Sequence, residues 1–383
     1  MKLIIKLLLF SMIFTFVQKA TFAQGQAAVP FLLIAPDSRA GAMGESGGGL
    51  ANNSAAIFWN PAGIAFLDGA EVSVTHSNWL PQFNVGIFYD YLTFRDYIPD
   101  INGSITSSVT YMNYGQFVRT SEFSPTPIGT FDAYDMAFTV GYATKLSADW
   151  GIGFNLRLIH SQLSDQPTAN EQGHGTATTV SFDVATMWRP AKFILPFIDY
   201  DLGKKFSVGV NLSNLGPKIY YIDRAQADPL PTNFRLGIAW NIFSDQYNSL
   251  MYTLDFSKEL ISTDSSKQFY QAIFTSWADR PFNQELQSIA TSMGFEYWYG
   301  TPGDFLFALR MGYFYEDPSY GGRKFMSFGA GIRYDIYGFD FSYLTTSMFQ
   351  NGDQSPLNNT LRFTISIGWG GTVGETRGLP RGI

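Results

Sequence analysis

Residues 361–370 alternate apolar side chains with small or polar ones without a break. The odd positions read Leu, Phe, Ile, Ile and Trp, and the even positions read Arg, Thr, Ser, Gly and Gly. Successive side chains of a β-strand point to opposite faces, so this run predicts a strand with one wholly apolar face. A chain made of many such strands must turn all its apolar faces to one side of a sheet. The same alternation recurs at residues 152–158, 206–212, 234–240, 305–315 and 327–334.

The connections between these runs indicate how the sheet is arranged. About fourteen strands can be placed between residues 70 and 370, and bacterial membrane barrels have an even number of strands. Tight connections at 147–149, 244–248, 300–304 and 335–338 alternate with long ones at 163–174, 214–232, 259–290, 317–323 and 348–359. Short turns at one end and long loops at the other are typical of membrane barrels. The connection at 192–200 is an exception, long and apolar on the short-turn side, and could be a docking edge or an additional edge segment.

The composition separates a membrane barrel from a soluble β-protein. Charged residues make up only 15% of the chain, aromatic residues 17%, and the mean hydropathy is -0.02. A soluble sandwich or propeller would have to bury the apolar face of every strand, while the opposite faces are too charged and glycine-rich for a second core. The fold class expected is therefore all-β: a transmembrane antiparallel β-barrel with half of each strand facing lipid.

The N-terminal residues carry the features of an export signal. Lys2 and Lys6 precede an apolar run at 7–17, which is shorter than the roughly 20 residues needed to span a membrane. With a barrel downstream, export implies the cell outer membrane. The expected organisation is a signal peptide at 1–23, an N-terminal hatch or plug at 24–69, a barrel at 70–370 and a C-terminal tail at 371–383.

The polar faces of the predicted strands carry charges whose signs largely alternate from strand to strand. These lumen positions are Arg157, Asp183, Arg235, Asp255, Glu296, Arg310, Arg333, Asp340 and Arg362. We expect Arg333 to lie opposite Asp340 across a tight turn, and Arg235 to lie similarly opposite Asp255. Such pairs would brace a filled lumen. A selectivity ring for a charged solute would need an excess of one sign, which the sequence does not have.

A second set of candidate residues belongs to the hatch: Arg39, Phe58, Trp59, Asn60 and Pro61. Proline fixes its own φ and disfavours helical backbone in the residue before it, so Asn60 and Pro61 predict a turn. Phe58 and Trp59 would then anchor the hatch in the barrel mouth. The alternative is an ordinary loop turn.

Aromatic residues in the two longest outer connections are the candidates for contact with a partner or cargo. They are Tyr220, Tyr221, Phe269, Tyr270, Phe274 and Trp277. The last four recur at near-helical spacing and would form one apolar stripe, and exposed aromatic clusters mark binding surfaces. The alternative is that the stripe packs down as a lid over the lumen.

Enzymatic chemistry has little support in the sequence. Residues 44–48 match G-x-S-x-G, but no buried strand precedes them as a nucleophile elbow requires. The three histidines are too dispersed for metal spacing, and the chain has no cysteine. A net charge of -7 argues against a nucleic-acid partner. We expect no cofactor, no metal and no catalytic residue.

Three segments resemble a known family. PFLLIAPDSRAGAMGESG at 30–47, AAIFWNPAG at 55–63, and SNLGPKIYY with PLPTNFRLG within 213–237 are similar to the PorV/PorQ family of Bacteroidetes outer-membrane proteins. The W-N-P-A run also resembles the hatch of FadL-type barrels, which have fourteen strands. The resemblance implies a non-enzymatic component of the type IX secretion system.

The resemblance also implies partners for the chain. These are a large outer-membrane translocon barrel, secreted cargo proteins with C-terminal signal domains, and a surface sortase-like attachment protein, with membrane lipid around the wall. Two other functions stay open on the sequence: FadL-like transport of hydrophobic small molecules, and an outer-membrane enzyme. A shared fold does not decide between them.

Overall fold

The computed structural model describes residues 27–121, 123–165, 175–196, 199–301, 304–349 and 355–371. The expected signal peptide at 1–23, His174, and residues 372–383 of the expected tail lie outside this part of the chain.

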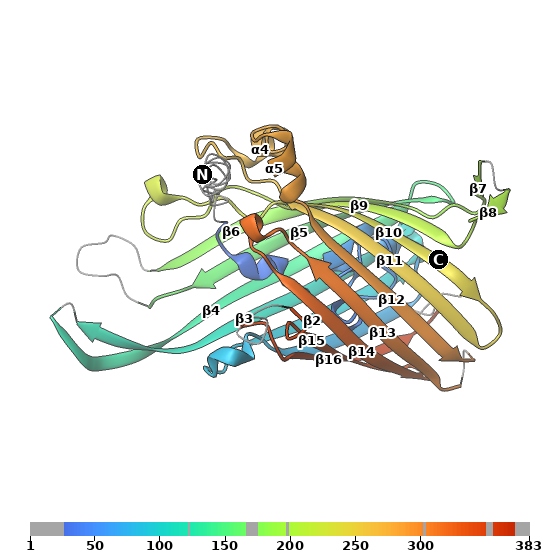
Figure 1. The fold of residues 1–383 in the computed structure, drawn as a ribbon, viewed down its shortest axis with the longest axis horizontal. Helices are drawn as coiled ribbons and strands as arrows, with labels where there is room; N and C mark the ends of the chain where they lie inside the picture. The colour runs from blue at the N-terminus through green and yellow to red at the C-terminus, as the bar shows by residue number, and fades with distance from the viewer. Residues whose placement is uncertain are drawn as a thin grey trace, which may run out of the picture.

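Fourteen antiparallel strands close into one barrel in the described part of the chain (Figure 1). Each strand pairs with its neighbours in the chain, and β1 closes the ring on β16. This confirms the predicted fold class and strand number. The strands are β1 Ala70–Asn78, β2 Phe88–Ile98, β3 Gly103–Ser121, β4 Ser124–Lys145, β5 Trp150–Gln162, β6 Thr176–Trp188, β9 Phe206–Leu215, β10 Asn233–Ser244, β11 Asn248–Glu259, β12 Ala290–Gly300, β13 Leu306–Tyr315, β14 Lys324–Tyr334, β15 Tyr337–Thr345 and β16 Thr360–Trp369.

The two faces of the wall differ as the alternation predicts. Leu156 and Leu309 point outward and are 58% and 65% exposed, while the adjacent Arg157 and Arg310 point inward and are buried. Apolar side chains on the outside and polar ones in the lumen are the pattern of a membrane barrel.

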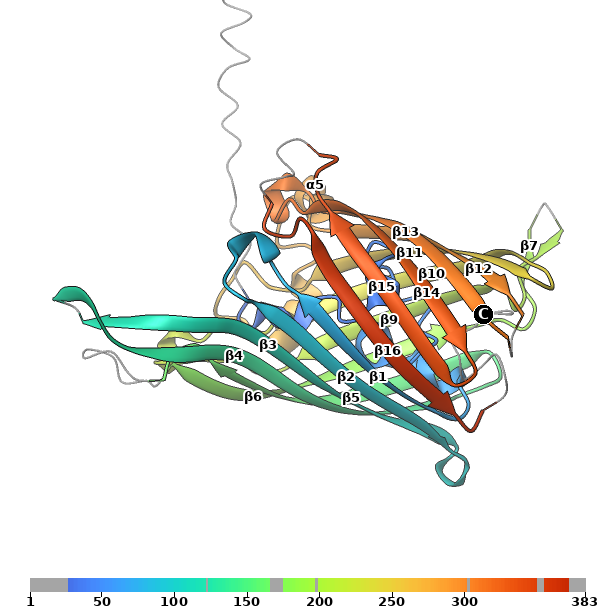
Figure 2. The same ribbon diagram turned by 90° about the horizontal axis from the view of Figure 1, so that it is seen from below.

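Strands β3 and β4 are longer than predicted. They were expected at 103–116 and 133–147, but they continue as a hairpin that extends beyond the rest of the barrel (Figure 2). Phe117 and Phe131 stack across the extension with ring centroids 5.7 Å apart. Aromatic cross-strand pairs of this kind extend the pairing past the bulge at Gly115.

The apolar connection at the short-turn end forms a separate two-stranded sheet. Its strands are β7 Ile194–Leu195 and β8 Tyr200–Asp201, and they do not join the barrel sheet. Phe193 packs edge-on against Trp188 of β6, with ring centroids 5.2 Å apart. The connection is therefore not an additional edge of the barrel.

The N-terminal segment lies inside the ring of strands (Figures 1 and 2). It is built from short turns of helix: η1 Pro30–Leu33, α2 Ser38–Gly41, α3 Ala56–Trp59 and η2 Pro61–Phe66. Residues 35–65 are buried almost throughout. We call residues 27–69 the plug.

The β11–β12 connection carries two further helices, α4 Phe269–Thr275 and α5 Phe282–Gln287. We call residues 260–289 the excursion. The remaining connections hold η3 Pro81–Phe83, η4 Pro99–Ile101, η5 Arg224–Gln226 and η6 Pro318–Tyr320. None of the helices in the described residues is long and apolar enough to cross a membrane.

Candidate functional site: the plugged lumen and the outer rim

The plug backbone lies directly on glycines of the wall. A Cβ added at Gly237 of β10 would be 2.2 Å from the amide nitrogen of Gly49, and one at Gly312 of β13 would be 1.9 Å from that of Gly44. No side chain has room at either strand position, which explains the glycine-rich inner faces. The plug is therefore in van der Waals contact with the wall and leaves no annular gap at these strands.

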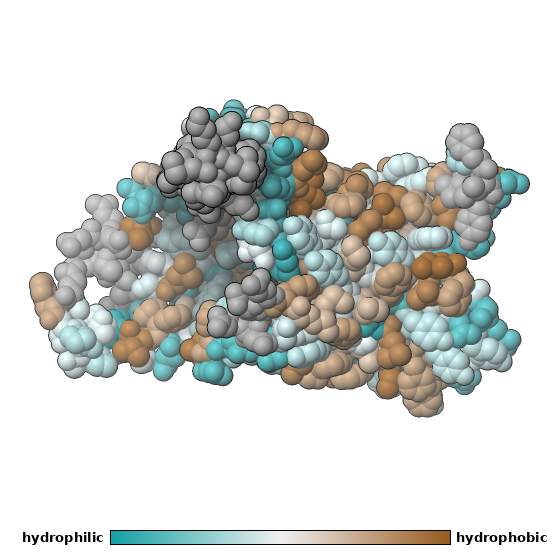
Figure 3. Space-filling view, in the orientation of Figure 1, coloured by the Kyte–Doolittle hydropathy of each residue, from teal (hydrophilic) through white to brown (hydrophobic). Residues whose placement is uncertain are grey.

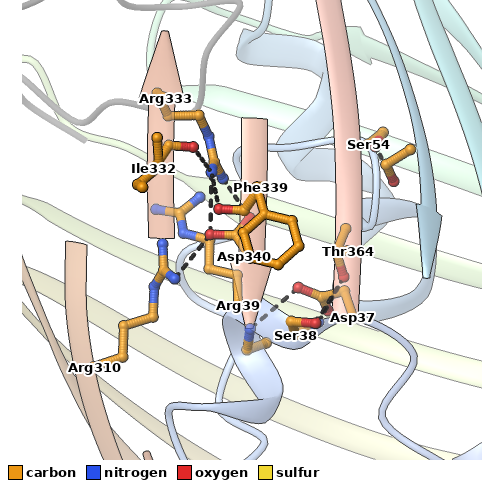
Figure 4. A network of polar contacts seen from close by, with 12 residues as sticks. Asp37, Ser38, Arg39, Ser54, Arg310, Ile332, Arg333, Phe339, Asp340 and Thr364 are labelled. Atoms are coloured by element: carbon orange, nitrogen blue, oxygen red, sulfur yellow. Dashed lines mark hydrogen bonds and ion pairs between the residues drawn. The ribbon is translucent and has the colours of Figure 1, made fainter. Parts of the chain in front are cut away.

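One ion-pair network links the plug to four neighbouring strands, and Figure 4 shows its part around Asp340. Arg39 of the plug binds Glu296 of β12 with two hydrogen bonds of 2.7 and 2.6 Å. Arg310 of β13 bridges Glu296 and Asp340, at 2.7 and 2.8 Å. Arg333 of β14 binds the same Asp340 of β15 at 2.5 Å. All five side chains are at least nine-tenths buried, so their charges must be compensated within the network.

Asp37 of the plug is a third buried carboxyl beside this network. Its carboxylate accepts hydrogen bonds from the indole N–H of Trp59 at 2.7 Å and from the backbone N–H of Ala40 at 3.1 Å. Trp59 is thereby fixed at its polar end as well as by burial of its ring.

A second anchor holds the glycine-rich turn of the plug. Asp255 of β11 accepts hydrogen bonds from the backbone N–H groups of Gly47 and Gly48, at 3.0 and 2.8 Å. Arg235 of β10 donates to the same carboxylate at 3.2 Å, and its guanidinium lies 4.9 Å from the centroid of the Trp59 ring. Asp255 therefore binds plug and wall together.

The prediction that Arg333 lies directly opposite Asp340, and Arg235 opposite Asp255, is wrong: the strand register is shifted by two residues. Arg333 pairs in register with Gly338, and Asp340 with Gly331. Arg235 and Asp255 are offset in the same way. The long arginine side chains still reach the carboxylates diagonally, a distance that flexible side chains span in antiparallel sheets.

The third anchor joins Arg157 and Asp183, two of the predicted lumen residues. Arg157 of β5 donates to both carboxylate oxygens of Asp183 of β6, at 3.1 and 2.8 Å. Asn155 donates to Asp183 and to the carbonyl of Ile57 in the plug, both at 2.8 Å. Asp183 also accepts from the backbone N–H of Asn214 at 2.8 Å. This pair therefore links the plug to three strands, β5, β6 and β9.

The structure places Asn60 and Pro61 at the joint between α3 and η2. Asn60 has extended backbone, with φ -164° and ψ 98°, and its side chain accepts from the N–H of Ala62 at 3.0 Å. Its amide also donates to the carbonyl of Thr186 on β6 at 3.1 Å. Phe58 packs edge-on against Trp59, with ring centroids 4.8 Å apart. The turn is therefore attached to the wall.

Glu45, Glu71 and Arg95 are charged residues of the lumen that were not predicted. Glu45 of the plug binds Arg362, which was predicted, at 3.1 Å. Glu71 of β1 accepts from the backbone N–H and hydroxyl of Ser54, and it pairs with Arg95 of β2 at 3.3 Å. Glu71 and Arg95 lie at inward positions of their strands, so strand parity could have found them. Glu45 lies in an irregular segment with no such signal.

Tyr220 and Tyr221 differ in their surroundings although they are adjacent. The Tyr221 hydroxyl donates to Ser161 at 2.9 Å, and burial raises its pKa to about 12. Tyr220 is 43% exposed, with the guanidinium of Arg224 near its ring. Tyr220 is therefore available at the surface, whereas Tyr221 is part of the rim packing.

The aromatic stripe of the excursion packs on the outside of the wall. Phe269 lies edge-on against Phe182 of β6, with ring centroids 6.2 Å apart. Trp277 lies edge-on against Phe234 of β10, at 5.2 Å. Phe182 and Phe234 both point outward. The alternative of a lid over the lumen is therefore wrong, while Tyr270 and Phe274 stay exposed at 56% and 78%.

A cavity of about 580 Å³ lies at the outer rim between the β9–β10 loop and the excursion. Its lining mixes apolar and charged side chains, and Ala272 of α4 forms part of it. Asp264 is on the same lining, and hydrogen bonds from Ser266 lower the pKa of its carboxyl. The cavity is within the size range of ordinary ligand pockets. Charged lining residues are Lys218, Asp228, Asp264, Lys267, Asp279 and Arg280.

A closed fourteen-strand barrel with an apolar outer wall and a lumen filled by its own N-terminal segment defines an integral outer-membrane β-barrel with a plugged lumen. The family described as "Type IX secretion system protein PorV" matches residues 18–266. The chain belongs to this PorV family and is an outer-membrane barrel of type IX secretion.

Solved structures share the architecture at low sequence identity. The toluene transporter TodX of Pseudomonas putida is 10% identical, with a TM-score of 0.46 over 87% of this chain and 98% of that one. A TodX deltaS2S3 mutant, titled a monoaromatic hydrocarbon channel, is 11% identical over 87% and 97%, with a TM-score of 0.51. A FadL homologue of Pseudomonas aeruginosa is 12% identical over 87% and 98%, with a TM-score of 0.46. No curated protein sequence matches the chain.

Proposed function

We propose that this barrel is a non-enzymatic docking component of the secretion system. It binds the large translocon barrel, receives cargo with a C-terminal signal domain, and passes that cargo to the surface attachment complex. The observation that carries this proposal is the plugged lumen in a chain of the PorV family. The plug is attached to the wall at each anchor described above. The barrel therefore binds its partners on its outer surfaces in this proposal.

The surroundings of Ser46 support the non-enzymatic assignment. Ser46 is the central residue of the G-x-S-x-G match, and it is fully buried. Its hydroxyl contacts the carboxylate of Asp255 at 3.4 Å, beside the two backbone bonds that fix the same turn. A nucleophile needs a base and access to substrate. Ser46 instead belongs to the anchor of the plug.

The cavity at the outer rim is the proposed site of cargo contact. Its mixed lining suits a peptide segment, because apolar walls take side chains while charged groups pair with the backbone and polar ends. The exposed Tyr220 lies on the loop that forms one wall. Cargo would therefore bind between the β9–β10 loop and the excursion.

The second candidate function is transport of hydrophobic small molecules, as the titles of the TodX structures say of those proteins. A lumenal pocket lined by Leu32, Phe58, Tyr89 and Tyr91 has a volume of only about 10 Å³. That is room for about one water molecule and not for an aromatic ring. This geometry favours secretion over transport.

The test is a mild-detergent pull-down of the tagged barrel from native membranes. Co-purification of a very large barrel and of secreted cargo supports docking, whereas fatty acids without a protein partner support transport. Ala272→Trp fills the rim cavity and should remove cargo from the complex while the large barrel stays. Ala278→Trp is the matched control, because Ala278 is exposed on the same excursion and does not line the cavity. Equal cargo recovery from both variants would contradict the proposed cargo site.

A further inference from the structure

A lysine of the lipid-facing wall is buried beneath the excursion. Lys258 of β11 follows Leu254 and Phe256 at the same parity, so its side chain points outward, yet it is only 3% exposed. Its ammonium binds Glu285 of α5 at 2.5 Å and also donates to Ser288. A bare lysine on the outer wall of a barrel is costly at membrane depth. The excursion therefore covers and neutralises a charge that would otherwise face lipid.

Aromatic contacts attach the excursion to the same side of the wall. Phe234 and Lys258 are register partners on β10 and β11, and both contact Trp277. Phe269 contacts Phe182 on β6. Every one of these wall residues points outward. The helices α4 and α5 thus lie beside the barrel wall near its outer end, which Figure 1 shows above β6, β9 and β10.

Each helix of the excursion exposes two large apolar or aromatic side chains spaced four residues apart, which places the pair on one face of the helix. Tyr270, Phe274, Phe282 and Leu286 are 56%, 78%, 74% and 52% exposed. In Figure 3 brown side chains of this region stand next to brown side chains of the wall at the upper edge of the molecule. Four large apolar side chains on two short helices form a patch of the kind that marks a contact surface.

We propose that the excursion is an interfacial anchor that inserts these four side chains into the outer leaflet of the membrane. The occupant is lipid because the patch continues the lipid-facing wall: Val180, Phe182 and Val184 beside it are exposed by 48%, 41% and 37%. Short helices with aromatic and leucine side chains on one face lie in the plane of a bilayer interface. The Lys258–Glu285 pair neutralises a charge that would oppose insertion of the excursion into lipid. This proposal does not depend on the function in secretion.

The chain has no cysteine, so single labels can be placed without removing native thiols. Phe274→Cys and Phe282→Cys, each carrying an environment-sensitive dye, are reconstituted in phosphatidylcholine vesicles with brominated acyl chains. Leu309→Cys on the outer wall is the control for a lipid-facing label, and Phe123→Cys at the 96% exposed hairpin tip is the control for a water-facing one. Folding of each variant is checked by heat-modifiable gel migration.

The expected result is blue-shifted emission and strong quenching at both excursion sites, close to that of the Leu309 label. Quenching no greater than that of the Phe123 label would overturn the anchor. A label that is exposed to water in vesicles and becomes buried only in the complex from native membranes would also overturn it, since that result indicates a protein partner on the patch.

Discussion

The plug and the excursion are two additions to the same barrel, and they attach to opposite faces of its wall by different means. The plug binds the inner face through charge networks and through backbone contacts to glycine. The excursion binds the outer face through aromatic rings and the ion pair between Lys258 and Glu285. The inner face of the wall therefore binds its cover through ion pairs and close backbone contacts, and the outer face binds mainly through aromatic contacts.

This difference follows from the solvent of each face. Inside the lumen the plug is buried almost throughout, and a buried polar group is costly unless it is hydrogen-bonded. Outside, the wall is already apolar, and only groups that break the apolar pattern need a partner. We therefore expect the plug to be held by directional bonds that tolerate little change, and the excursion to tolerate more.

The largest expected effect is at the joint of the plug. Trp59→Ala with Asn60→Ala removes a fully buried ring, its bond to Asp37 and the link to the carbonyl of Thr186. A buried Trp→Ala change costs about 3–5 kcal/mol and each lost hydrogen bond about 1 kcal/mol more. The plug should loosen, so protease should cut within residues 27–69 and small antibiotics should enter cells faster.

The matched control for that variant is Phe83→Ala with Asn84→Ala. This aromatic–asparagine pair is exposed on the β1–β2 connection and should change neither proteolysis nor uptake. If the Trp59 and Asn60 variant behaves like this control, the joint does not hold the plug.

The next effect compares one carboxylate from each face. Glu296→Gln removes the carboxylate that Arg39 and Arg310 share, and an uncompensated buried charge costs about 3–5 kcal/mol. Glu285→Gln leaves a single cation, Lys258, unpaired, and its ammonium keeps the hydrogen bond to Ser288, so the cost should be smaller. Urea unfolding of the folded barrel in detergent micelles measures both. A larger loss of unfolding free energy for the Glu285 variant than for the Glu296 variant would contradict the expectation that the inner face tolerates less change.

Glycine on the inner face gives a third and smaller effect. Gly237→Val would place side-chain atoms on the backbone of Gly49, and overpacking of this kind costs about 1–3 kcal/mol. Gly129→Val is the control, because Gly129 lies on the exposed part of β4 and its nearest neighbour atom is 3.8 Å away. The Gly237 variant should unfold at lower urea and expose the plug to protease. Identical midpoints for the two variants would show that the close contact is not required.

The barrel was predictable from the sequence because apolar and polar side chains alternate along each of its strands. The alternation at 361–370 places Arg362 inward, and the structure agrees. Parity does not say which residue of an irregular segment reaches a strand, so the bonds of Glu45 could not be predicted. The length of β3 and β4 was underestimated because their ends extend past the neighbouring strands, where the regular alternation of apolar and polar side chains is lost.

The excursion shows a second limit of the sequence argument. Its helical stripe at Phe269, Phe274 and Trp277 was recognised, but periodicity gives a face and not the surface that the face meets. The lid interpretation assumed that a long outer loop folds inward over the mouth. The outward-pointing Lys258 was the available signal, since a charge at a lipid-facing position requires a partner and Glu285 lies within the same loop.

The smallest effects separate two residues of that stripe. Trp277→Ser removes the edge-on contact with Phe234 and the contact with the ammonium of Lys258, each worth about 0.5–1.5 kcal/mol. Phe274 is 78% exposed, and a surface change of this kind is usually within about 0.5 kcal/mol. In detergent, Trp277→Ser should therefore raise the rate of protease cleavage within residues 260–289, while Phe274→Ser should not. Because neither residue touches the plug, protection of residues 27–69 should be unchanged in both variants. Loss of plug protection in either variant would show that the two faces of the wall are coupled, and the contrast between them would fail.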